Sequence, residues 1–357
     1  MQLSRRAVPV LVVTALLVVL AVVATTVLVI VPRLHRSPLQ QALDLVPASS
    51  LRVGFTDWAA VRDRLASGPV RSEKALDALL SKAYDTDLSA ASSIDESAEA
   101  LRTHYGFSPA NATWEAYAQS RTGAVMVLKM PDSVDLDTVA DKLDALGYGK
   151  PRSDAGAWTG GAELVSQIDP TISPELQYVV LDRDRHLVLA SDTLDYVRTA
   201  AKVARGDAKS MSGDDVSGVA GRAGTSAAAF VWSNGFACED LAMSQAAPED
   251  QKTGEGLVRR AGGVTPLDGL VVGLSATRRL TVALGFENDR QADHDLKPRA
   301  TLLVGPAVVR SGSYADDLRL TRSHTDGSTV LLELRAKQRT GPVLTTLASG
   351  PVLFATC

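Results

Sequence analysis

The sequence has few histidines, few aromatic residues and no excess of positive charge, and each scarcity excludes a class of site. The five histidines include no pair at zinc-site spacing. Aromatic residues make up only 5% of the chain, so stacking platforms for bases or sugars are sparse. The formal net charge is −4, which leaves no basic field for nucleic acid. We therefore predict no nucleic-acid partner.

Motifs that mark an active site or a cofactor site are also missing. The chain has no G-x-S-x-G elbow, and the glycine pairs at 160–161 and 262–263 precede no G-K-[ST] of a phosphate loop. His294 lies between Asp293 and Asp295, a set that can bind metal, but a solvated acidic helix start is the commoner explanation. We predict no catalytic residue, no cofactor and no metal site, which leans against an enzyme without excluding one.

What the sequence does have is a long apolar run over residues 8–31. No Asp, Glu, Lys or Arg interrupts it between Arg6 and Arg33. As a helix the run is roughly 36 Å long, enough to cross a bilayer with some tilt. We predict a transmembrane helix over 8–31 with the lipid bilayer as its partner, preceded by a short cytoplasmic tail (1–7) and followed by a membrane-proximal stalk (32–49).

A cleaved signal peptide is the alternative to this anchor. Arg5 and Arg6 would form its charged region, and residues 22–24 (Val-Val-Ala) are a tolerable cleavage site. The run stays apolar beyond that site, which favours an uncleaved signal anchor, although cleavage stays open. Arg33 and Arg36 follow the run, so the positive charge is only slightly greater before it. This bias predicts a cytoplasmic N-terminus and an extracytoplasmic C-terminal domain at the cell membrane.

The two cysteines, Cys238 and Cys357, predict one disulfide in such an extracytoplasmic domain. The bond would tie down a chain end that otherwise frays. It would close a loop of 357 − 238 = 119 residues, for which the chain-entropy model allows up to roughly 5 kcal/mol. The alternative is two unpaired thiols, one buried and one at a frayed terminus.

After the anchor, the pattern of strands and helices predicts an α+β ectodomain of two halves. The first half covers 50–206 and contains a helical insertion, a glycine-rich exposed connection follows at 207–224, and the second half covers 225–357. The stretches "SLRVGFTDWAAVRDRL" and "SAAAFVWSNGFACEDL" each predict a strand, a capping Asp or Asn, and a short helix. We expect each half to be a mainly antiparallel sheet with helices packed on one face. One continuous α+β domain without a repeat is the alternative.

Within the first half, Ser108 and Pro109 resemble the start of a helix, because proline is favoured at the first helical position. The sequence therefore predicts a helix in which Trp114 and Tyr117 lie on one side.

Aromatic residues mark the strand-to-helix corner of each half. The residues concerned are Phe55, Asp57, Trp58, Phe230, Trp232 and Asn234. Core packing and helix capping explain them most simply. The functional alternative is a ligand pocket between the halves that these side chains line.

The start of the chain resembles a broad group of uncharacterised actinobacterial single-pass membrane-anchored extracytoplasmic proteins. The resemblance is carried by Arg5 and Arg6, the Val/Leu-rich anchor and the segment "VPASSLRVGFTDWAAVRDRL". It implies location and anchoring but no activity.

We expect a membrane-anchored extracytoplasmic protein with a non-catalytic binding or scaffolding function at the cell envelope, where a second envelope protein could be its partner. The alternatives are an envelope enzyme with a dispersed site and a ligand-binding module with a cleft between its halves.

Overall fold

The computed structural model describes residues 36–153, 156–213, 215–310 and 312–357. Contacts within the chain separate residues 1–37 from residues 38–357, and the second unit contains every described strand and helix. The predicted cytoplasmic tail and transmembrane helix lie outside the described residues, as does most of the segment from 32 to 37. Among the residues that are described, no helix is both long and apolar enough to cross a membrane.

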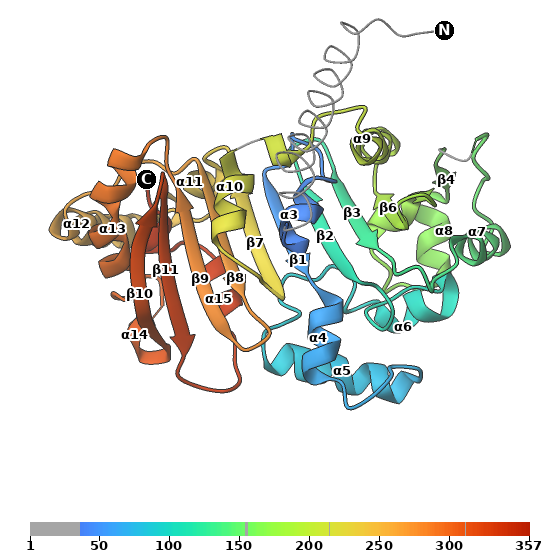
Figure 1. Cartoon of the computed structure of the whole chain (residues 1–357), viewed down its shortest axis with the longest axis horizontal. Helices are drawn as coiled ribbons and strands as arrows, with labels where there is room; N and C mark the ends of the chain where they lie inside the picture. Colours follow the sequence, from blue (N-terminus) through green and yellow to red (C-terminus); the bar gives the residue numbers. More distant parts are fainter. Residues whose placement is uncertain (1–35, 154–155, 214, 311) are drawn as a thin grey trace, which may run out of the picture. The chain divides into compact units, whose positions relative to one another are not determined.

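A single eleven-stranded sheet runs through the unit 38–357 (Figure 1). Its strand order is β10-β11-β9-β8-β7-β1-β2-β3-β6-β5-β4, and every neighbouring pair is antiparallel. The strands are β1 (Arg52–Thr56), β2 (Trp114–Gln119), β3 (Ala124–Lys129), β4 (Trp158–Thr159), β5 (Tyr178–Asp182), β6 (Leu187–Ser191), β7 (Ala228–Ser233), β8 (Gly269–Leu274), β9 (Arg279–Gly285), β10 (Leu318–Asp326) and β11 (Thr329–Ala336). The predicted α+β class with antiparallel strand pairing is therefore confirmed, although the strands form one large sheet and not a separate sheet in each half.

The two predicted halves share this sheet, because the first strand of one pairs with the first strand of the other. Strand β1 pairs with β7 from Arg52 opposite Trp232 to Thr56 opposite Ala228. The hydrogen-bonded ladder is thus unbroken from one half to the other.

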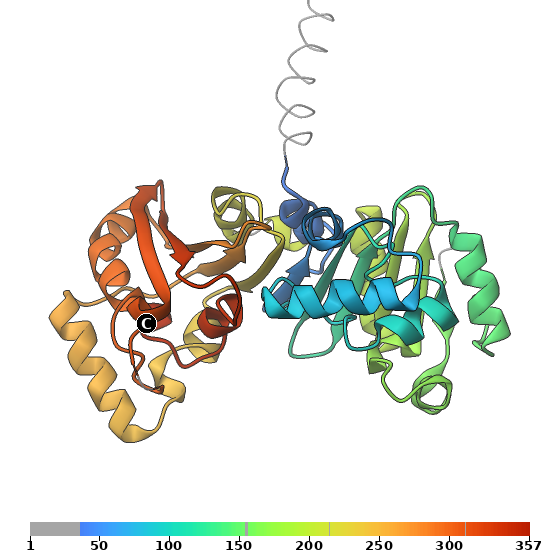
Figure 2. The same cartoon turned by 90° about the horizontal axis from the view of Figure 1, so that it is seen from below.

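Helices cover both faces of the sheet (Figure 2). They are α3 (Pro38–Leu43), α4 (Trp58–Leu65), α5 (Glu73–Asp85), α6 (Ala98–Ala100), α7 (Leu136–Ala145), α8 (Gly161–Ile168), α9 (Leu194–Arg205), α10 (Asp215–Arg222), α11 (Phe236–Asp240), α12 (Pro248–Ala261), α13 (Asp289–Leu303), α14 (Tyr314–Asp317) and α15 (Leu344–Ala348). On what we call the first face, strand residues such as Val272 pack under α4, α5, α7, α8, α11, α13 and α15. On the second face, residues such as Val231 pack under α3, α9 and α10.

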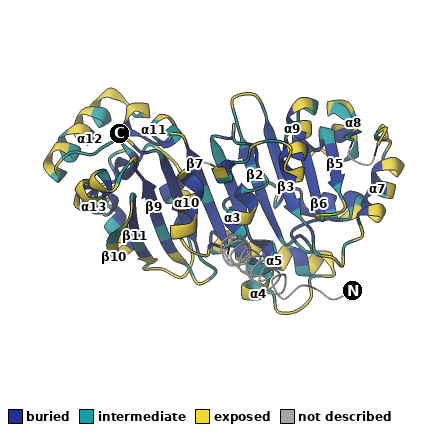
Figure 3. Cartoon of the chain, turned by 45° about the horizontal axis from the view of Figure 1, so that its top comes forward, coloured by how far each residue is buried: buried dark blue, intermediate teal, exposed yellow. Residues whose placement is uncertain are grey.

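The prediction that helices pack on one face only is therefore wrong. Strand β8, for example, is buried at all of its positions from Gly269 to Leu274. A strand that is apolar on both sides loses stability unless both sides are removed from water. Figure 3 shows the result, with buried strands between helices whose outer surfaces are exposed.

The segment predicted as an exposed connection, 207–224, contains the buried helix α10. Val216, Val219 and Ala220 follow helical spacing and pack onto the second face. Glycine in the strands below makes this approach possible, since a Cβ on Gly285 would lie 2.6 Å from Cγ2 of Val219. The small residues of this segment therefore serve close packing as well as chain flexibility.

The helix predicted from Ser108 and Pro109 is also absent, because Trp114 and Tyr117 belong to strand β2. Trp114 packs on the second face, whereas Tyr117 packs against the core of the first. The side chains of "WEAYAQ" alternate between the two faces with the period of a strand, and pairing with both β1 and β3 decides the conformation.

The predicted disulfide between Cys238 and Cys357 is confirmed, with Cα atoms 5.5 Å apart. It links α11 to the last residue of the chain. The terminal segment is also held by the buried Arg299, which donates hydrogen bonds to the carbonyl oxygens of Phe354 (2.7 Å) and Thr356 (2.6 Å). The C-terminus is thus an integral part of the second half.

Removing this bond by the double substitution Cys238→Ala and Cys357→Ala should lower the free energy of unfolding by about 2–5 kcal/mol, because the unfolded chain gains the freedom of an open loop. Urea unfolding followed by circular dichroism measures the difference. Unfolding of the wild type in excess reductant is the matched control. Equal stability of the variant and the oxidised wild type would contradict a stabilising role for the bond.

Candidate functional site

The aromatic residues predicted for the first corner lie on opposite faces of the sheet. Phe55 is fully buried on the second face, with its ring centroid 6.2 Å from that of Trp114. Trp58 is fully buried on the first face, in α4. Asp57 caps that helix by accepting a hydrogen bond from the Ala60 amide at 2.9 Å. Phe55 and Trp58 therefore cannot line one pocket together.

At the second corner the structure brings Phe230 and Trp232 together, with ring centroids 5.9 Å apart. The guanidinium of Arg52 lies 4.9 Å from the Phe230 ring, a cation–π contact across the seam between the halves. The indole of Trp232 is buried and donates a hydrogen bond to Asp240 at 2.7 Å. Asn234 has a positive φ of 50° where the chain turns into α11. Phe230 and Trp232 are thus engaged in packing, and Asn234 forms a tight turn.

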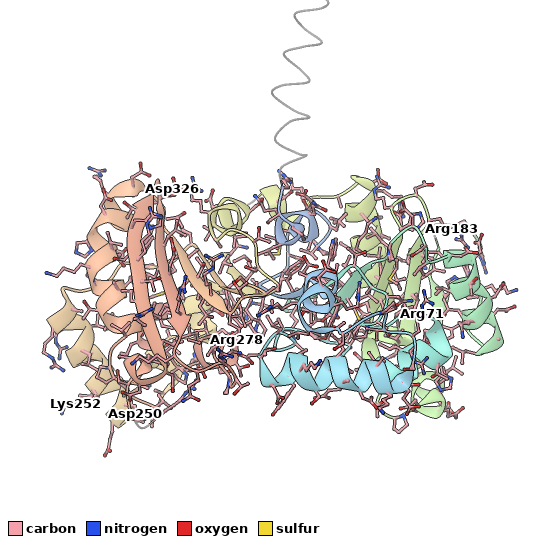
Figure 4. All side chains as sticks on the ribbon, turned by 60° about the horizontal axis from the view of Figure 1, so that its bottom comes forward. Arg71, Arg183, Asp250, Lys252, Arg278 and Asp326 are labelled. Carbon is pink, nitrogen blue, oxygen red and sulfur yellow. A yellow bond between two sulfur atoms is a disulfide. The ribbon has the colours of Figure 1, made fainter. Side chains whose placement is uncertain are left out.

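A pocket of about 720 Å³ lies elsewhere, where α4 and α5 of the first half meet the β8–β9 turn and the end of β11. Six cationic residues line it: Arg64, Lys82, Arg278, Arg279, Arg335 and Arg339. The other lining residues are leucine, alanine, threonine and glutamine, so the lining contains no carboxylate, histidine, serine or cysteine. Figure 4 shows Arg278 beside one end of α5. We call this site the basic pocket.

The positive charges of the basic pocket are not neutralised within the described residues, where none of the six cations forms an ion pair with a carboxylate. The Lys82 ammonium donates to the carbonyl oxygen of Leu65 at 3.2 Å. Arg278 donates to the carbonyl oxygens of Thr86 and Gly341, while its Nε has no hydrogen-bond partner. Burial lowers the pKa of Arg278, against the opposing effect of the Asp87 charge.

Three arginines stand directly opposite one another on neighbouring strands. Arg319 of β10 is opposite Arg335 of β11, which is opposite Arg279 of β9. All three side chains are exposed. Like charges at directly opposed positions destabilise a sheet. This row, which we call the arginine ladder, therefore opposes folding and would be relieved by an anion.

A buried carboxylate fixes the two sides of the basic pocket to each other. Asp87, which follows α5, accepts hydrogen bonds from the amides of Val343 (2.8 Å), Leu344 (2.5 Å) and Thr345 (2.9 Å) at the start of α15. Its second oxygen accepts a bond from the Thr345 hydroxyl at 2.6 Å. These four bonds join the insertion of the first half to the last helix of the second. They also occupy the one carboxylate that acts on Arg278.

The corresponding turn of the first half is neutralised instead. The β2–β3 turn carries Arg121, whose guanidinium pairs with Glu239 in α11 at 2.6 Å. Arg121 thus reaches across to the second half, as Arg278 of the β8–β9 turn reaches across to the first. The β8–β9 turn differs in that Arg278 forms no ion pair in the described residues and shares its pocket with five further cations.

A second buried polar cluster lies in the centre of the first face around Glu115 of β2. The carboxyl is fully buried and accepts a hydrogen bond from the Ser93 amide at 2.9 Å. Thr56 lies directly opposite it on β1. The second carboxyl oxygen of Glu115, the Thr56 hydroxyl and the Trp58 indole nitrogen make no hydrogen bond of regular geometry among the described residues, although Trp58 lies close enough to act on the carboxyl. Burial raises the pKa of Glu115 to about 8, against the opposing effects of Ser92, Trp58 and Ser93.

Comparison with known proteins gives no family. No protein-family model and no curated protein matches the chain. Two solved structures of TP0453, its crystal forms III and I, cover 86% of this chain and 97% and 98% of their own. Their sequence identities are 9% and 10%, and their TM-scores are 0.32 and 0.30. Values this low establish neither a common family nor a common function.

The raised pKa of Glu115 predicts that stability falls as the pH rises from about 4.5 to about 8. Below this window the carboxyl is protonated in both states. Within it the unfolded chain ionises first, so unfolding releases a proton and stability drops by on the order of 1 kcal/mol per pH unit. Above it both states are ionised and the dependence on this group ends.

The substitution Glu115→Gln keeps an acceptor for the Ser93 amide but cannot ionise. Relative to the wild type it should become progressively more stable from pH 4.5 to 8, as measured by urea unfolding at each pH. Glu96→Gln, at an exposed position, is the matched control and should follow the wild type. Parallel pH profiles for wild type and Glu115→Gln would show that the carboxyl is ionised in the folded state.

Proposed function

We propose that this protein is a membrane-anchored extracytoplasmic binding protein whose basic pocket holds an anionic ligand without transforming it. The observation that carries the proposal is the gathering of six cations, without carboxylate partners in the described chain, around one pocket of about 720 Å³. In a chain of net charge −4, so much uncompensated positive charge at one place needs a counter-charge from outside.

The composition of the basic pocket favours binding over catalysis. Arginine and lysine are proton donors without an acceptor at neutral pH, so the lining offers no general base that could activate the hydroxyl of its threonines, Thr86 and Thr277. It does offer guanidinium groups, which pair with phosphate and carboxylate through two parallel hydrogen bonds. Such a site can select and hold an anion, and an enzyme would need a different site.

A ligand-binding role is also favoured over scaffolding. A scaffold should expose a contiguous apolar patch. The exposed large hydrophobic residues in the described part of the chain are Tyr84 and Val309, which lie far apart in the sequence on α5 and before α14. A second envelope protein as partner would therefore have to bind through polar contacts.

The placement outside the cytoplasm rests on two features. Residues 8–31 are apolar, uncharged and long enough for a transmembrane helix. The disulfide between Cys238 and Cys357 is of a kind that persists in oxidising compartments. Together they support a single-pass anchor with a cytoplasmic N-terminus, as the resemblance to actinobacterial membrane-anchored proteins also implies.

We also propose that the two halves arose by duplication. The order β1-β2-β3-β6-β5 of the first half has the same connectivity as β7-β8-β9-β11-β10 of the second. A short helix, α3 or α10, precedes each first strand, and a longer helix, α7 or α13, follows each third strand. Each of the two corresponding hairpin turns also contains a hydrogen bond between a serine and a threonine hydroxyl. The oxygens are 3.3 Å apart in Ser120–Thr122 and 3.1 Å apart in Ser275–Thr277.

The substitution Arg335→Glu should weaken the binding of inorganic pyrophosphate at least tenfold, because it replaces an attraction by a repulsion at the pocket wall. Isothermal titration of the full-length protein in nonionic detergent measures the affinity, which should also fall as NaCl rises from about 0.05 to about 0.5 M. Lys252→Glu makes the same charge change on the exposed side of α12 and should have little effect. An equal loss in both variants would mean that only net charge matters and would refute the pocket.

The topology can be tested by labelling intact cells with a membrane-impermeant maleimide. Cys238 and Cys357 should label only after reduction, and a non-reducing digest should contain one peptide linked through both. If both cysteines stay unlabelled after reduction but react once the cells are opened, the domain is cytoplasmic and the proposed location is wrong.

A further inference from the structure

The cations of the basic pocket come from both halves of the protein. Arg64 and Lys82 belong to α4 and α5 of the first half, whereas Arg278, Arg335 and Arg339 belong to the second. The pocket volume of about 720 Å³ lies within the ~300–1,000 Å³ of sites that enclose whole organic ligands. One inorganic anion would occupy a small part of it and leave the cations of one side without a counter-charge.

The positive charge continues beyond the pocket along the arginine ladder. Arg279 and Arg335 line the pocket, while Arg319 of the ladder lies outside its lining, on β10. Neighbouring strands are about 4.8 Å apart, so the three arginines span roughly 10 Å from the pocket outwards. The cations thus form a track and not a single centre.

We propose that the ligand is a flexible chain carrying several phosphate groups, which bridges the two halves across the basic pocket and continues along the arginine ladder. This inference rests on the proposed anion-binding function and adds the chemical class of its ligand. Several phosphates on one chain place negative charge at several points of the track at once. The second and later contacts are then intramolecular, which raises the affinity far above that for one phosphate.

A soluble chain fits this site better than a lipid surface does. The cations line a recess between elements of both halves, where a flat array of headgroups would reach only the rim. The exposed large apolar side chains in the described residues, Tyr84 and Val309, are two isolated positions and offer no insertion surface.

A ligand that bridges the pocket should also stabilise the contact that Asp87 makes between the two halves. The lining residues Lys82 and Thr86 precede Asp87 in the chain. Gln338 and Arg339 precede residues 343–345, whose amides donate hydrogen bonds to Asp87. A chain bound across the pocket therefore draws together the two segments that this carboxylate joins. Its binding should slow hydrogen exchange at the amides of Val343 to Thr345.

The test compares two charge-reversed pairs of the full-length protein in nonionic detergent. Arg64→Glu with Lys82→Glu alters the first half only, and Arg335→Glu with Arg339→Glu alters the second only. The probe is an end-labelled inorganic polyphosphate, followed by fluorescence anisotropy. Each pair should lose at least tenfold in affinity, whereas the control pair Lys252→Glu with Arg290→Glu, at exposed positions of α12 and α13, should stay within about twofold of wild type at moderate salt. Circular dichroism and the thermal midpoint verify that each variant is folded.

The outcomes separate the two proposals. If polyphosphate binds and only the second-half pair loses affinity, the ligand does not bridge the halves, although the anion site stands. If orthophosphate binds as tightly as polyphosphate, the multivalent ligand is refuted. If vesicles with anionic headgroups bind while polyphosphate does not, a soluble chain is the wrong class. If no anion binds in any of these forms, the proposed function fails as well.

Discussion

The antiparallel pairing of β1 with β7 is the constraint on which the rest of the structure depends. Its register, with Gly54 opposite Phe230, makes one sheet out of two sets of strands. Because a ladder of backbone hydrogen bonds fixes both distance and orientation, every element attached to one half has a set position relative to the other. The close fit is visible at Gly54, where a Cβ atom would lie 2.7 Å from the carbonyl oxygen of Ala91. The β8–β9 turn consequently meets the end of α5, and the basic pocket forms between them.

The seam is secured by polar contacts of different strength. The exposed pair Arg121–Glu239 contributes little, since exposed ion pairs are generally weak. Asp87 contributes more, because its carboxylate is buried and accepts bonds from three amides that start a helix. Glu115, on β2 beside β1, is buried with a raised pKa, and one of its oxygens makes no hydrogen bond of regular geometry. The contact between the halves therefore combines the stabilising hydrogen bonds of Asp87 with a buried polar cluster around Glu115 that lowers stability.

The sequence indicated more of the fold than of the site. Alternation of apolar residues predicted the strand around Val53, and two cysteines in a domain predicted to be extracytoplasmic predicted their disulfide. Local signals failed at Pro109, where pairing with β1 and β3 overrode a helix start. They failed again at 207–224, where glycines that suggested an open linker allow close packing of α10. The basic pocket left no local signal, because its residues run from Arg64 to Arg339 and meet only through the sheet.

The two outer strands of the sheet have a consequence for how copies of this protein behave at high concentration. An open edge offers unpaired backbone groups to any passing strand and is a route to aggregation. Here β4 consists of only Trp158 and Thr159, and β10 is interrupted by a bulge between Leu320 and Arg322. The exposed charges of Arg319 and Arg322 stand on that same outer strand. Arg319 of the arginine ladder thus also disfavours pairing with a second sheet at the β10 edge, as the shortness of β4 does at the opposite edge.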